Sequence, residues 1–327
     1  MTLGPRRGTV IGLPSVLLFL GCGESEPYGA PRGAAYSAAE VSVTTSAGLT
    51  LVGTLTLPLN AELPVPAVVT ITGSGPQDRD EYMGHVGEYR PFRQIADTLG
   101  SVGIAVLRLD DRGVGSSDFG SPGATSTDLA EDVRSAVRYL RSRPGVDGAK
   151  IGLIGHSEGG VIGPMVAADD SAIAALALLA APAYTLRRVS ESAMEAVIDK
   201  TPTLSRQEAE DMRRRSARSS ERRSAEDPWF RAAYSYDPLP VIRQVRAPVL
   251  LLHGETDTQI TPEQADTLKA ALLEAGNQDV SVVRFPNANH LFLEDLDGRA
   301  FRYDGLPSHE VRRDVLGTLV DWLLEHL

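Results

Sequence analysis

The sequence predicts an α/β fold, with a mostly parallel, doubly wound sheet between layers of helices. Two observations predict it. Short, continuous apolar runs recur along the chain, and amphipathic stretches separate them. Continuous apolar runs are typical of strands that are buried on both faces, as parallel strands are. Their alternation with helices favours a doubly wound sheet.

The composition is that of an ordinary soluble globular protein. Of the 327 residues, 42% are hydrophobic and 23% are charged, and the formal net charge is -11. These values predict one large domain that can bury a sizeable core and can carry an insertion. The acidic balance argues against nucleic acid as a partner and gives no electrostatic reason to bind an anionic membrane surface. It leaves the charge of a substrate open.

Residues 1–22 have the layout of a signal peptide. Arg6 and Arg7 precede an apolar stretch at residues 10–20, which is too short to span a bilayer, and Gly21-Cys22 follows. Cys22 is the only cysteine, so an internal disulfide is excluded. Its position is similar to the cleavage site of a bacterial lipoprotein, which predicts lipidation of Cys22 and attachment to a membrane of the cell envelope. A plain secreted protein, or an accidental cysteine in an apolar start, are the alternatives.

The expected elements follow in order. Residues 23–39 are rich in Gly, Pro, Ser and Ala and predict a flexible tether. An antiparallel hairpin is then expected from residues 41–45 and 49–57, which flank a turn. Parallel strands are predicted at residues 67–72, 104–109, 150–154, 173–179, 248–253 and 280–285. Helices are predicted at residues 91–100, 128–141, 161–168, 262–275 and 308–326, the second with a capping box that Glu131 completes.

One charged segment breaks this alternation. Residues 185–237 contain no strand-like run and have helical spacing, which predicts a helical cap inserted between core segments 40–184 and 238–327. Six arginines between residues 213 and 223 are interspersed with acidic residues at helical pairing distance, which favours a solvated helix face over an anion site. Trp229 and Phe230, with Tyr234, close the segment. These aromatic side chains either bind substrate in a cleft or pack in the core.

The segment Gly155-His156-Ser157-Glu158-Gly159 predicts a sharp turn between a strand and a helix, with Ser157 at its tip. A β-carbon at either flank of so tight a turn would collide with the crossing backbone, and Gly155 and Gly159 avoid this collision. The pattern also arises by chance in a chain with 31 glycines, so its function depends on partners elsewhere.

A serine hydroxyl needs a histidine to accept its proton and a carboxylate to orient that histidine. His290 follows the last apolar run, where loops at the carboxyl ends of strands bind ligands. The acid is expected in the loop after the preceding strand, with Asp257 as the choice and Glu255 in reserve. The other histidines are less suitable by position: His85, His156, His253, His309 and His326. The chain order Ser, Asp, His is that of α/β-hydrolases.

The negative oxygen of a tetrahedral intermediate needs hydrogen-bond donors. One is expected from the backbone N–H of Glu158, directly after the nucleophile. The second is expected from the Ser74 N–H in the glycine-rich turn after residues 67–72, with Gly73 or Gly75 as neighbours that let the backbone approach substrate. A purely structural turn is the competing interpretation.

Five motifs together resemble bacterial α/β-hydrolases of the esterase and lipase type. They are GSGPQDRDE at residues 73–81, DDRGVGS at 110–116, GHSEGG at 155–160, LHGETD at 252–257 and Asn289-His290. The resemblance implies the α/β-hydrolase fold and a carboxylesterase acting on small acyl esters, with the inserted helices as a lid. Related proteins include peptidases and acyltransferases. Thr72 departs from the pattern, since many relatives carry histidine there. Asp111-Arg112-Gly113 and residues 77–80 are interpreted as loop-shaping rather than substrate-binding.

The predicted function is therefore that of a serine hydrolase that cleaves carboxylic esters of small to medium acyl chains through an acyl-enzyme. A small-molecule ester and water are the expected reactants. No metal or organic cofactor is expected, because the histidines and the lone cysteine lack ligand spacing and the glycine-rich segments match no nucleotide fingerprint. The same triad could serve a peptidase, a thioesterase or an acyltransferase, and a non-catalytic lipid-anchored binding protein is the alternative of another class. The oligomeric state is left open.

Overall fold

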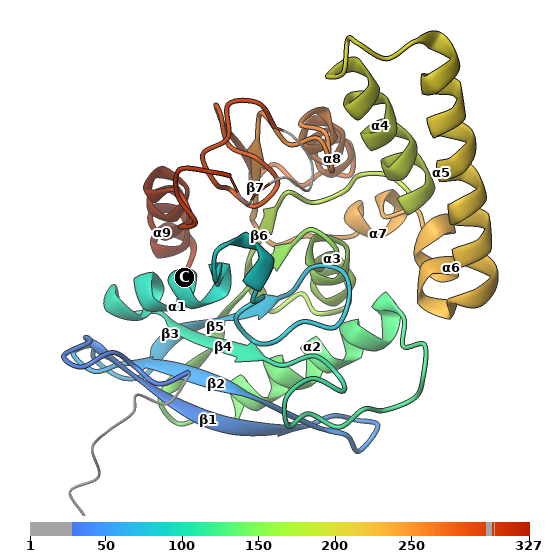
Figure 1. The fold of residues 1–327 in the computed structure, drawn as a ribbon. Helices are drawn as coiled ribbons and strands as arrows, with labels where there is room; N and C mark the ends of the chain where they lie inside the picture. The colour runs from blue at the N-terminus through green and yellow to red at the C-terminus, as the bar shows by residue number, and fades with distance from the viewer. Residues whose placement is uncertain (1–27, 299–302, 304) are drawn as a thin grey trace, which may run out of the picture.

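The computed structural model describes residues 28–298, 303 and 305–327. The described chain forms one eight-stranded sheet in the order β1-β2-β4-β3-β5-β6-β7-β8 (Figure 1). Strands β3 to β8 are parallel to one another, β1 is antiparallel to β2, and β2 is antiparallel to β4. The predicted fold class is therefore confirmed. The predicted signal peptide and Cys22 lie outside the described residues.

The strands follow the predicted apolar runs. Their bounds are β1 Tyr36–Thr44, β2 Thr50–Pro58, β3 Val65–Ile71, β4 Ala105–Leu109, β5 Val146–His156, β6 Ile173–Leu179, β7 Val249–Gly254 and β8 Val280–Phe285. Strands β3, β4, β6 and β7 are buried almost throughout, because helices cover both faces of the sheet. The edge strand β8 is only partly buried.

The prediction of a tether at residues 23–39 is wrong for residues 36–39, because β1 begins at Tyr36. Four residues assigned to the tether pair with β2 instead. The Tyr36 hydroxyl donates to Asp97 at 2.6 Å, and the Tyr28 ring lies 4.3 Å from the Arg79 guanidinium. Small residues resemble a linker in composition, and these long-range contacts are what order them.

Two apolar layers enclose the sheet. Helices α1 Pro91–Ser101 and α9 Arg313–His326 pack on one face, and α2 Ser126–Arg141, α3 Gly159–Asp169 and α8 Glu263–Glu274 pack on the other (Figure 1). Short helices η1 Gly84–Val86 and α7 Leu239–Ile242 lie in connections. The predicted capping box with Glu131 is wrong: Thr125 caps α2 with Asp128, and Glu131 instead accepts from Ser46 at 2.7 Å. The predicted last helix is five residues too long at its start.

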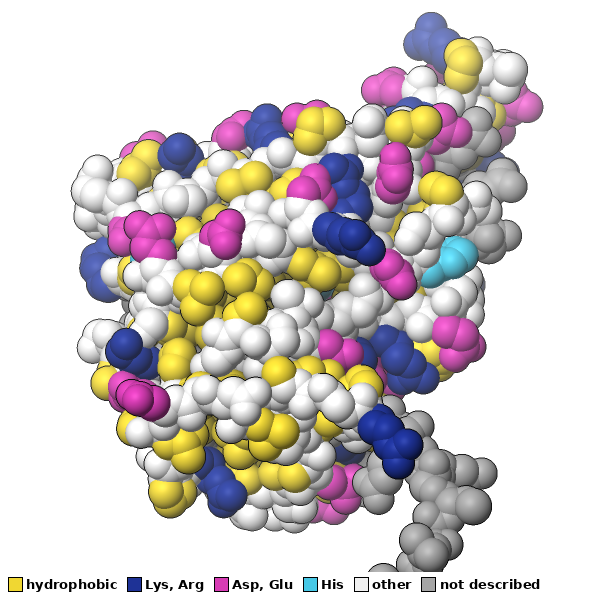
Figure 2. All heavy atoms as spheres, turned by 90° about the vertical axis from the view of Figure 1, so that its left-hand side faces the viewer, with side chains coloured by type: hydrophobic (Ala, Val, Ile, Leu, Met, Phe, Trp, Pro, Cys, Tyr) yellow, Lys and Arg dark blue, Asp and Glu magenta, His cyan; other side chains and the backbone are white. Residues whose placement is uncertain are grey.

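The inserted segment is helical, as predicted. It contains α4 Leu186–Asp199, α5 Arg206–Glu226 and α6 Pro228–Ser235, and these cap helices project beyond the sheet (Figure 1). Arg213 pairs with Glu195 on α4, and Arg214 pairs with Asp211 and Glu210 within α5. These two arginines of α5 thus form local ion pairs on an exposed face. Acidic and basic side chains are also interspersed on the face shown in Figure 2.

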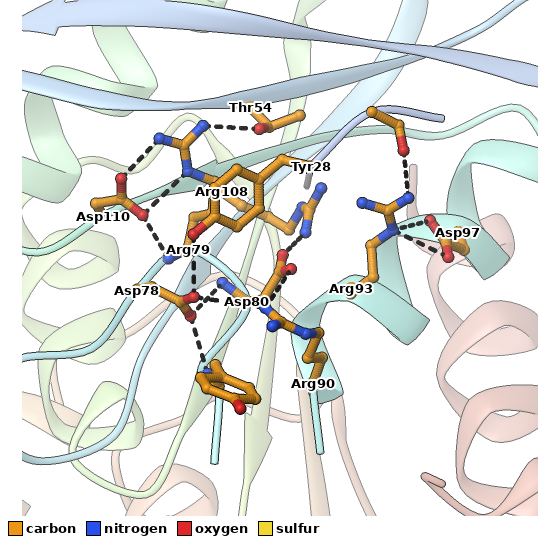
Figure 3. A network of polar contacts seen from close by, with 12 residues as sticks. Tyr28, Thr54, Asp78, Arg79, Asp80, Arg90, Arg93, Asp97, Arg108 and Asp110 are labelled. Atoms are coloured by element: carbon orange, nitrogen blue, oxygen red, sulfur yellow. Dashed lines mark hydrogen bonds and ion pairs between the residues drawn. The ribbon is translucent and has the colours of Figure 1, made fainter. Parts of the chain in front are cut away.

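A buried network of ion pairs holds the loop that follows β3 (Figure 3). Arg79 donates to Asp110 through Nε at 3.0 Å and Nη2 at 2.6 Å, and to Thr54 at 2.9 Å. Arg108 on β4 pairs with Asp80. The exposed fraction of these charged residues is 3% or less. The network supports the interpretation of the motif at residues 77–80 as loop-shaping.

Arg108→Met is expected to lower the free energy of unfolding by about 3–5 kcal/mol, because the buried Asp80 carboxylate loses its principal partner. Chemical denaturation followed by circular dichroism measures the loss. Arg214→Met is the matched control, since its ion pair with Asp211 is exposed and contributes little. Equal losses in the two variants would contradict a structural role for the buried pair.

No helix within the described residues is long and apolar enough to cross a membrane.

Candidate active site

Ser157 occupies a strained turn between β5 and α3. Its φ is 52°, in the left-handed region that side-chain-bearing residues rarely adopt. A β-carbon on Gly155 would lie 2.2 Å from the Gly159 carbonyl oxygen, and one on Gly159 would lie 2.1 Å from the Ile71 carbonyl oxygen. The predicted requirement for glycine at both flanks is therefore confirmed, and the turn presents Ser157 at the carboxyl end of β5.

His290 and Asp257 form a buried pair at the same edge of the sheet. Nδ1 of His290 lies 2.8 Å from Oδ2 of Asp257, and Oδ1 of Asp257 accepts from the backbone N–H groups of Gln259 and Ile260 at 2.8 and 3.0 Å. Burial alone would raise the pKa of Asp257, but His290 and His253 outweigh it and hold this pKa well below its usual range. The Asp257 carboxylate faces Nδ1 of His290, an arrangement that favours the tautomer with its proton on that nitrogen. Glu255, the reserve candidate, is exposed.

His156 connects this pair to the turn. Its Nε2 lies 3.1 Å from the His290 carbonyl oxygen, and the two imidazole rings are 5.0 Å apart. Ser157 is the next residue, so the loop of the candidate base packs against the turn that carries the candidate nucleophile. Within the described residues Ser157 Oγ makes no hydrogen bond to His290. Such bonds often lengthen when substrate is not bound.

Glu81 is a site residue that the motifs contain but that sequence reasoning did not assign. Its Oε1 accepts from His156 Nδ1 and from the Gly73 N–H, both at 2.8 Å. Both partners of the His156 ring, this carboxylate and the His290 carbonyl, are acceptors, so the ring carries a proton on each nitrogen. Burial lowers the pKa of His156, but the Glu81 carboxylate outweighs it and the net shift is upward.

Two backbone amides next to Ser157 have no acceptor among the described residues. These are the N–H groups of Ser74 and Glu158, and both residues line the same pocket as Ser157. Gly73 uses its own N–H on Glu81, and Gly75 serves the turn, with a φ of 93°. The amides predicted to hold an oxyanion are thus free to do so, while Gly73 and Gly75 do not line the pocket.

Asp111 shapes the loop that carries Ser74. It accepts from the Thr72 hydroxyl at 3.1 Å and from the Gln77 N–H at 2.9 Å, so it fixes both ends of the loop. Burial raises the pKa of Asp111 to about 7 against these hydrogen bonds. Thr72, the departure from the family pattern, therefore anchors the loop through its hydroxyl.

A cavity of about 80 Å³ adjoins Ser157. Its apolar wall comes from the core and from the cap, and includes Val161, Ile260, Leu186, Val189, Trp229 and Ala233. Trp229 is in the wall, as one interpretation predicted. Phe230 is not: it is buried inside the cap, stacked on Tyr234 with a ring separation of 5.5 Å. Adjacent positions on a helix point in different directions, so only one aromatic side chain of this pair can face the cavity.

The Glu158 side chain joins the turn to the cap. Its Oε1 accepts from the Ser126 hydroxyl at 2.6 Å and from Trp229 Nε1 at 2.7 Å. Sequence reasoning assigned only the backbone of Glu158, because nothing in the spacing of these three residues indicates that they meet. Within the described part of the chain, no group of three or more His, Cys, Asp or Glu side chains is arranged to hold a metal ion.

Gly159→Ala is expected to lower the free energy of unfolding by at least about 3 kcal/mol or to prevent folding, because backbone atoms cannot move aside for the new methyl group. Gly317→Ala on the exposed face of α9 is the control, since a β-carbon there meets no atom within 4 Å. That variant should be neutral or more stable by up to about 1 kcal/mol. Thermal unfolding compares the two, and a stable Gly159→Ala protein would contradict the close approach.

Glu81→Gln is expected to destabilise the protein more at low pH than at high pH. The raised pKa of His156 contributes stability that is fully present below the ordinary histidine value and is lost as pH rises through the raised value. Urea unfolding between pH 5.5 and 9 should therefore show a penalty that shrinks with increasing pH. Glu88→Gln is the control, because Glu88 is exposed and bonds only to the Tyr82 hydroxyl. A pH-independent penalty for Glu81→Gln would refute the buried ion pair.

Comparison with known proteins assigns the family. Residues 91–327 match the model of the prolyl oligopeptidase family. Esterase EstD of Thermotoga maritima is 26% identical over 284 residues, which are 84% of this chain and 66% of that esterase, slightly less than two thirds of its length.

Two solved structures share the architecture. An esterase of Pyrococcus furiosus gives a TM-score of 0.60 at 16% identity, covering 91% of this chain and 94% of the other. An acylaminoacyl peptidase of Pyrococcus horikoshii gives a TM-score of 0.60 at 19% identity, covering 90% of this chain and 42% of the other. These likenesses show the fold alone. With the family match over most of its length, the chain belongs to the prolyl oligopeptidase family and has the α/β-hydrolase fold.

Proposed function

We propose that this protein is a serine hydrolase that cleaves carboxylic esters of small to medium acyl chains. The observation that carries the proposal is the buried Asp257–His290 pair beside the strained turn of Ser157. The free amides of Ser74 and Glu158 and the apolar cavity support it. The esterase names of the Thermotoga maritima and Pyrococcus furiosus relatives agree with it.

In the proposed reaction, Ser157 Oγ attacks the ester carbonyl while His290 Nε2 accepts its proton. The Asp257 carboxylate stabilises the imidazolium, and the amides of Ser74 and Glu158 hydrogen-bond to the oxygen that becomes negative. His290 then returns the proton to the leaving alcohol, and an acyl-enzyme forms. Water attacks the acyl group by the reverse sequence, with His290 as base, and releases the acid.

The cap helices contribute a lid in this proposal. Leu186, Val189, Trp229 and Ala233 close the cavity from the cap side and are apolar, which favours an apolar acyl chain next to Ser157. Attachment to the cell envelope through a lipid on Cys22 stays a prediction from the sequence.

A peptidase is the second candidate, because the matching family is named for peptidases. The triad chemistry is the same for an amide, so the substrate class depends on the pocket and not on the nucleophile. A panel of p-nitrophenyl esters of graded acyl length, measured beside aminoacyl p-nitroanilides, separates the two. Faster turnover of the anilides would replace the esterase proposal by the peptidase.

Ser157→Ala is expected to reduce kcat on p-nitrophenyl butanoate by about a millionfold, and Asp257→Asn by about ten-thousandfold, by analogy with other triads. Labelling by a fluorophosphonate probe should disappear in Ser157→Ala. Ser219→Ala is the control, because Ser219 lies on the exposed face of α5, and it should label and hydrolyse as the wild type does. Hydrolysis by Ser157→Ala at the wild-type rate would refute the mechanism, and an unlabelled, inactive wild type would favour a binding protein.

A further inference from the structure

The Glu158 carboxylate is only half satisfied. The exposed fraction of Glu158 is 7%, and its Oε1 accepts from Ser126 and Trp229. Its Oε2 is buried and has no hydrogen-bond partner among the described residues. A desolvated carboxylate oxygen without a donor is costly, so native structures usually supply one. Residues Ser126, Glu158 and Trp229 all line the cavity next to Ser157, so the donor that is missing from the protein can come from a bound substrate.

Among the described residues, no positively charged side chain lines the cavity around Glu158. Among the described residues that line the cavity, Glu158 is the only one with a charged side chain. The nearby Asp111 adds no positive charge, since burial is the main cause that raises its pKa and the carboxylates of Glu81 and Glu158 raise it further. Glu81 pairs with His156, whereas the donors to Glu158 in the described part of the chain are the neutral groups of Ser126 and Trp229. A positive group in the cavity would find an unopposed carboxylate.

The same residue is placed to receive an oxyanion. In the proposed reaction, the carbonyl oxygen of the substrate becomes negative while the Glu158 backbone N–H binds it. This oxygen then lies about one side-chain length from the Glu158 carboxylate. Two like charges that close in a water-poor site repel each other, which works against hydrolysis of a neutral ester. A cation between the oxyanion and the carboxylate offsets this repulsion, most strongly in the transition state, where the oxyanion develops.

We propose that the preferred substrates carry a protonated amine, whose N–H group donates to Oε2 of Glu158 when the ester carbonyl faces Ser157. This inference rests on the proposed function and names its substrate class. Trp229 of α6 bonds to the other oxygen, Oε1, and lines the same cavity, so Oε2 is the oxygen of this carboxylate that is left for the substrate. The side chain of Glu158 then determines specificity, and its backbone N–H donates a hydrogen bond to the oxyanion.

Two matched pairs of esters test the proposal at pH 7, one for each side of the scissile bond. The first pair is 2-(dimethylamino)ethyl butanoate and 3-methylbutyl butanoate, in which N–H⁺ replaces C–H. The second pair is methyl 3-aminopropanoate and methyl butanoate. The wild type should favour the cationic ester in kcat/KM by about tenfold or more in at least one pair, and Glu158→Gln should remove most of this preference. Preference for the neutral ester in both pairs would overturn the inference.

Trp229→Phe separates recognition of charge from a merely structural bond to the cap. This variant removes the indole donor but keeps the carboxylate, so the ratio between cationic and neutral esters should persist while both rates change together. If the only role of Glu158 is to hold the cap in place, Glu158→Gln and Trp229→Phe will lower the rates for cationic and neutral esters alike. The ratio of these rates will then stay unchanged, which contradicts the proposal. Circular dichroism checks that each variant is folded.

A measurement on the wild type keeps the proposal testable if Glu158→Gln does not fold. 3-Methylbutylammonium should inhibit hydrolysis of methyl butanoate at least about tenfold more tightly than 3-methylbutanol, and equal inhibition would overturn the inference. Ser157→Ala distinguishes the two levels of failure. Hydrolysis by that variant would refute the proposed function, whereas its inactivity beside a wild type without cation preference would refute only the substrate class.

Discussion

The arrangement of the site depends on three backbone contacts that leave no room for a β-carbon. Gly155 and Gly159 bring the turn of Ser157 against itself and against the end of β3, and a β-carbon on Gly254 would lie 2.2 Å from the Ala288 carbonyl oxygen. The first two contacts place the nucleophile beside the loop of Ser74. The third places the loop of Asp257, after β7, against the loop of His290, after β8. The site is thus built by close backbone packing at one edge of the sheet, and the side chains only occupy positions that this packing provides.

Buried charge then fixes these loops to one another. Glu81 links the loop after β3 to His156, and His156 links the turn to the His290 carbonyl. His253 and His290 both face Asp257, which explains how a fully buried carboxylate stays ionised. Each charge lies where its desolvation is offset by a partner on a different loop. Among the described residues, Oε2 of Glu81 and Oε2 of Glu158 are both buried without a hydrogen-bond partner, but only Glu158 lines the cavity next to Ser157, which makes its Oε2 informative about function.

Much of the fold and part of the candidate site could be predicted from the sequence, because they depend on short-range patterns. The predicted bounds of β6 and β8 match the structure: β6 is a buried apolar run, and β8 is an apolar run that is only partly buried at the edge of the sheet. The pairing of His290 with Asp257 followed from chain order and from the place of each residue after a strand. The same reasoning could not find Glu81, because its contact with His156 joins residues 75 positions apart and nothing local requires it. It could not choose between Trp229 and Phe230, since that depends on how a whole cap helix is rotated against the core.

Glu158 shows why local patterns stop short of substrate class. The motif around Ser157 requires that this position supply a backbone N–H, and any residue that tolerates the turn would supply it. The side chain is under a different constraint, because its environment comes from α2 and from the cap, which meet the turn only in the folded protein. One residue therefore couples oxyanion binding, cap position and the charge of the cavity. A change in the cap that moved Trp229 would alter how well the carboxylate is shielded, and hence the electrostatic energy of the intermediate, without any contact to the reacting atoms. Specificity in this fold can thus change through helices that contribute no catalytic group.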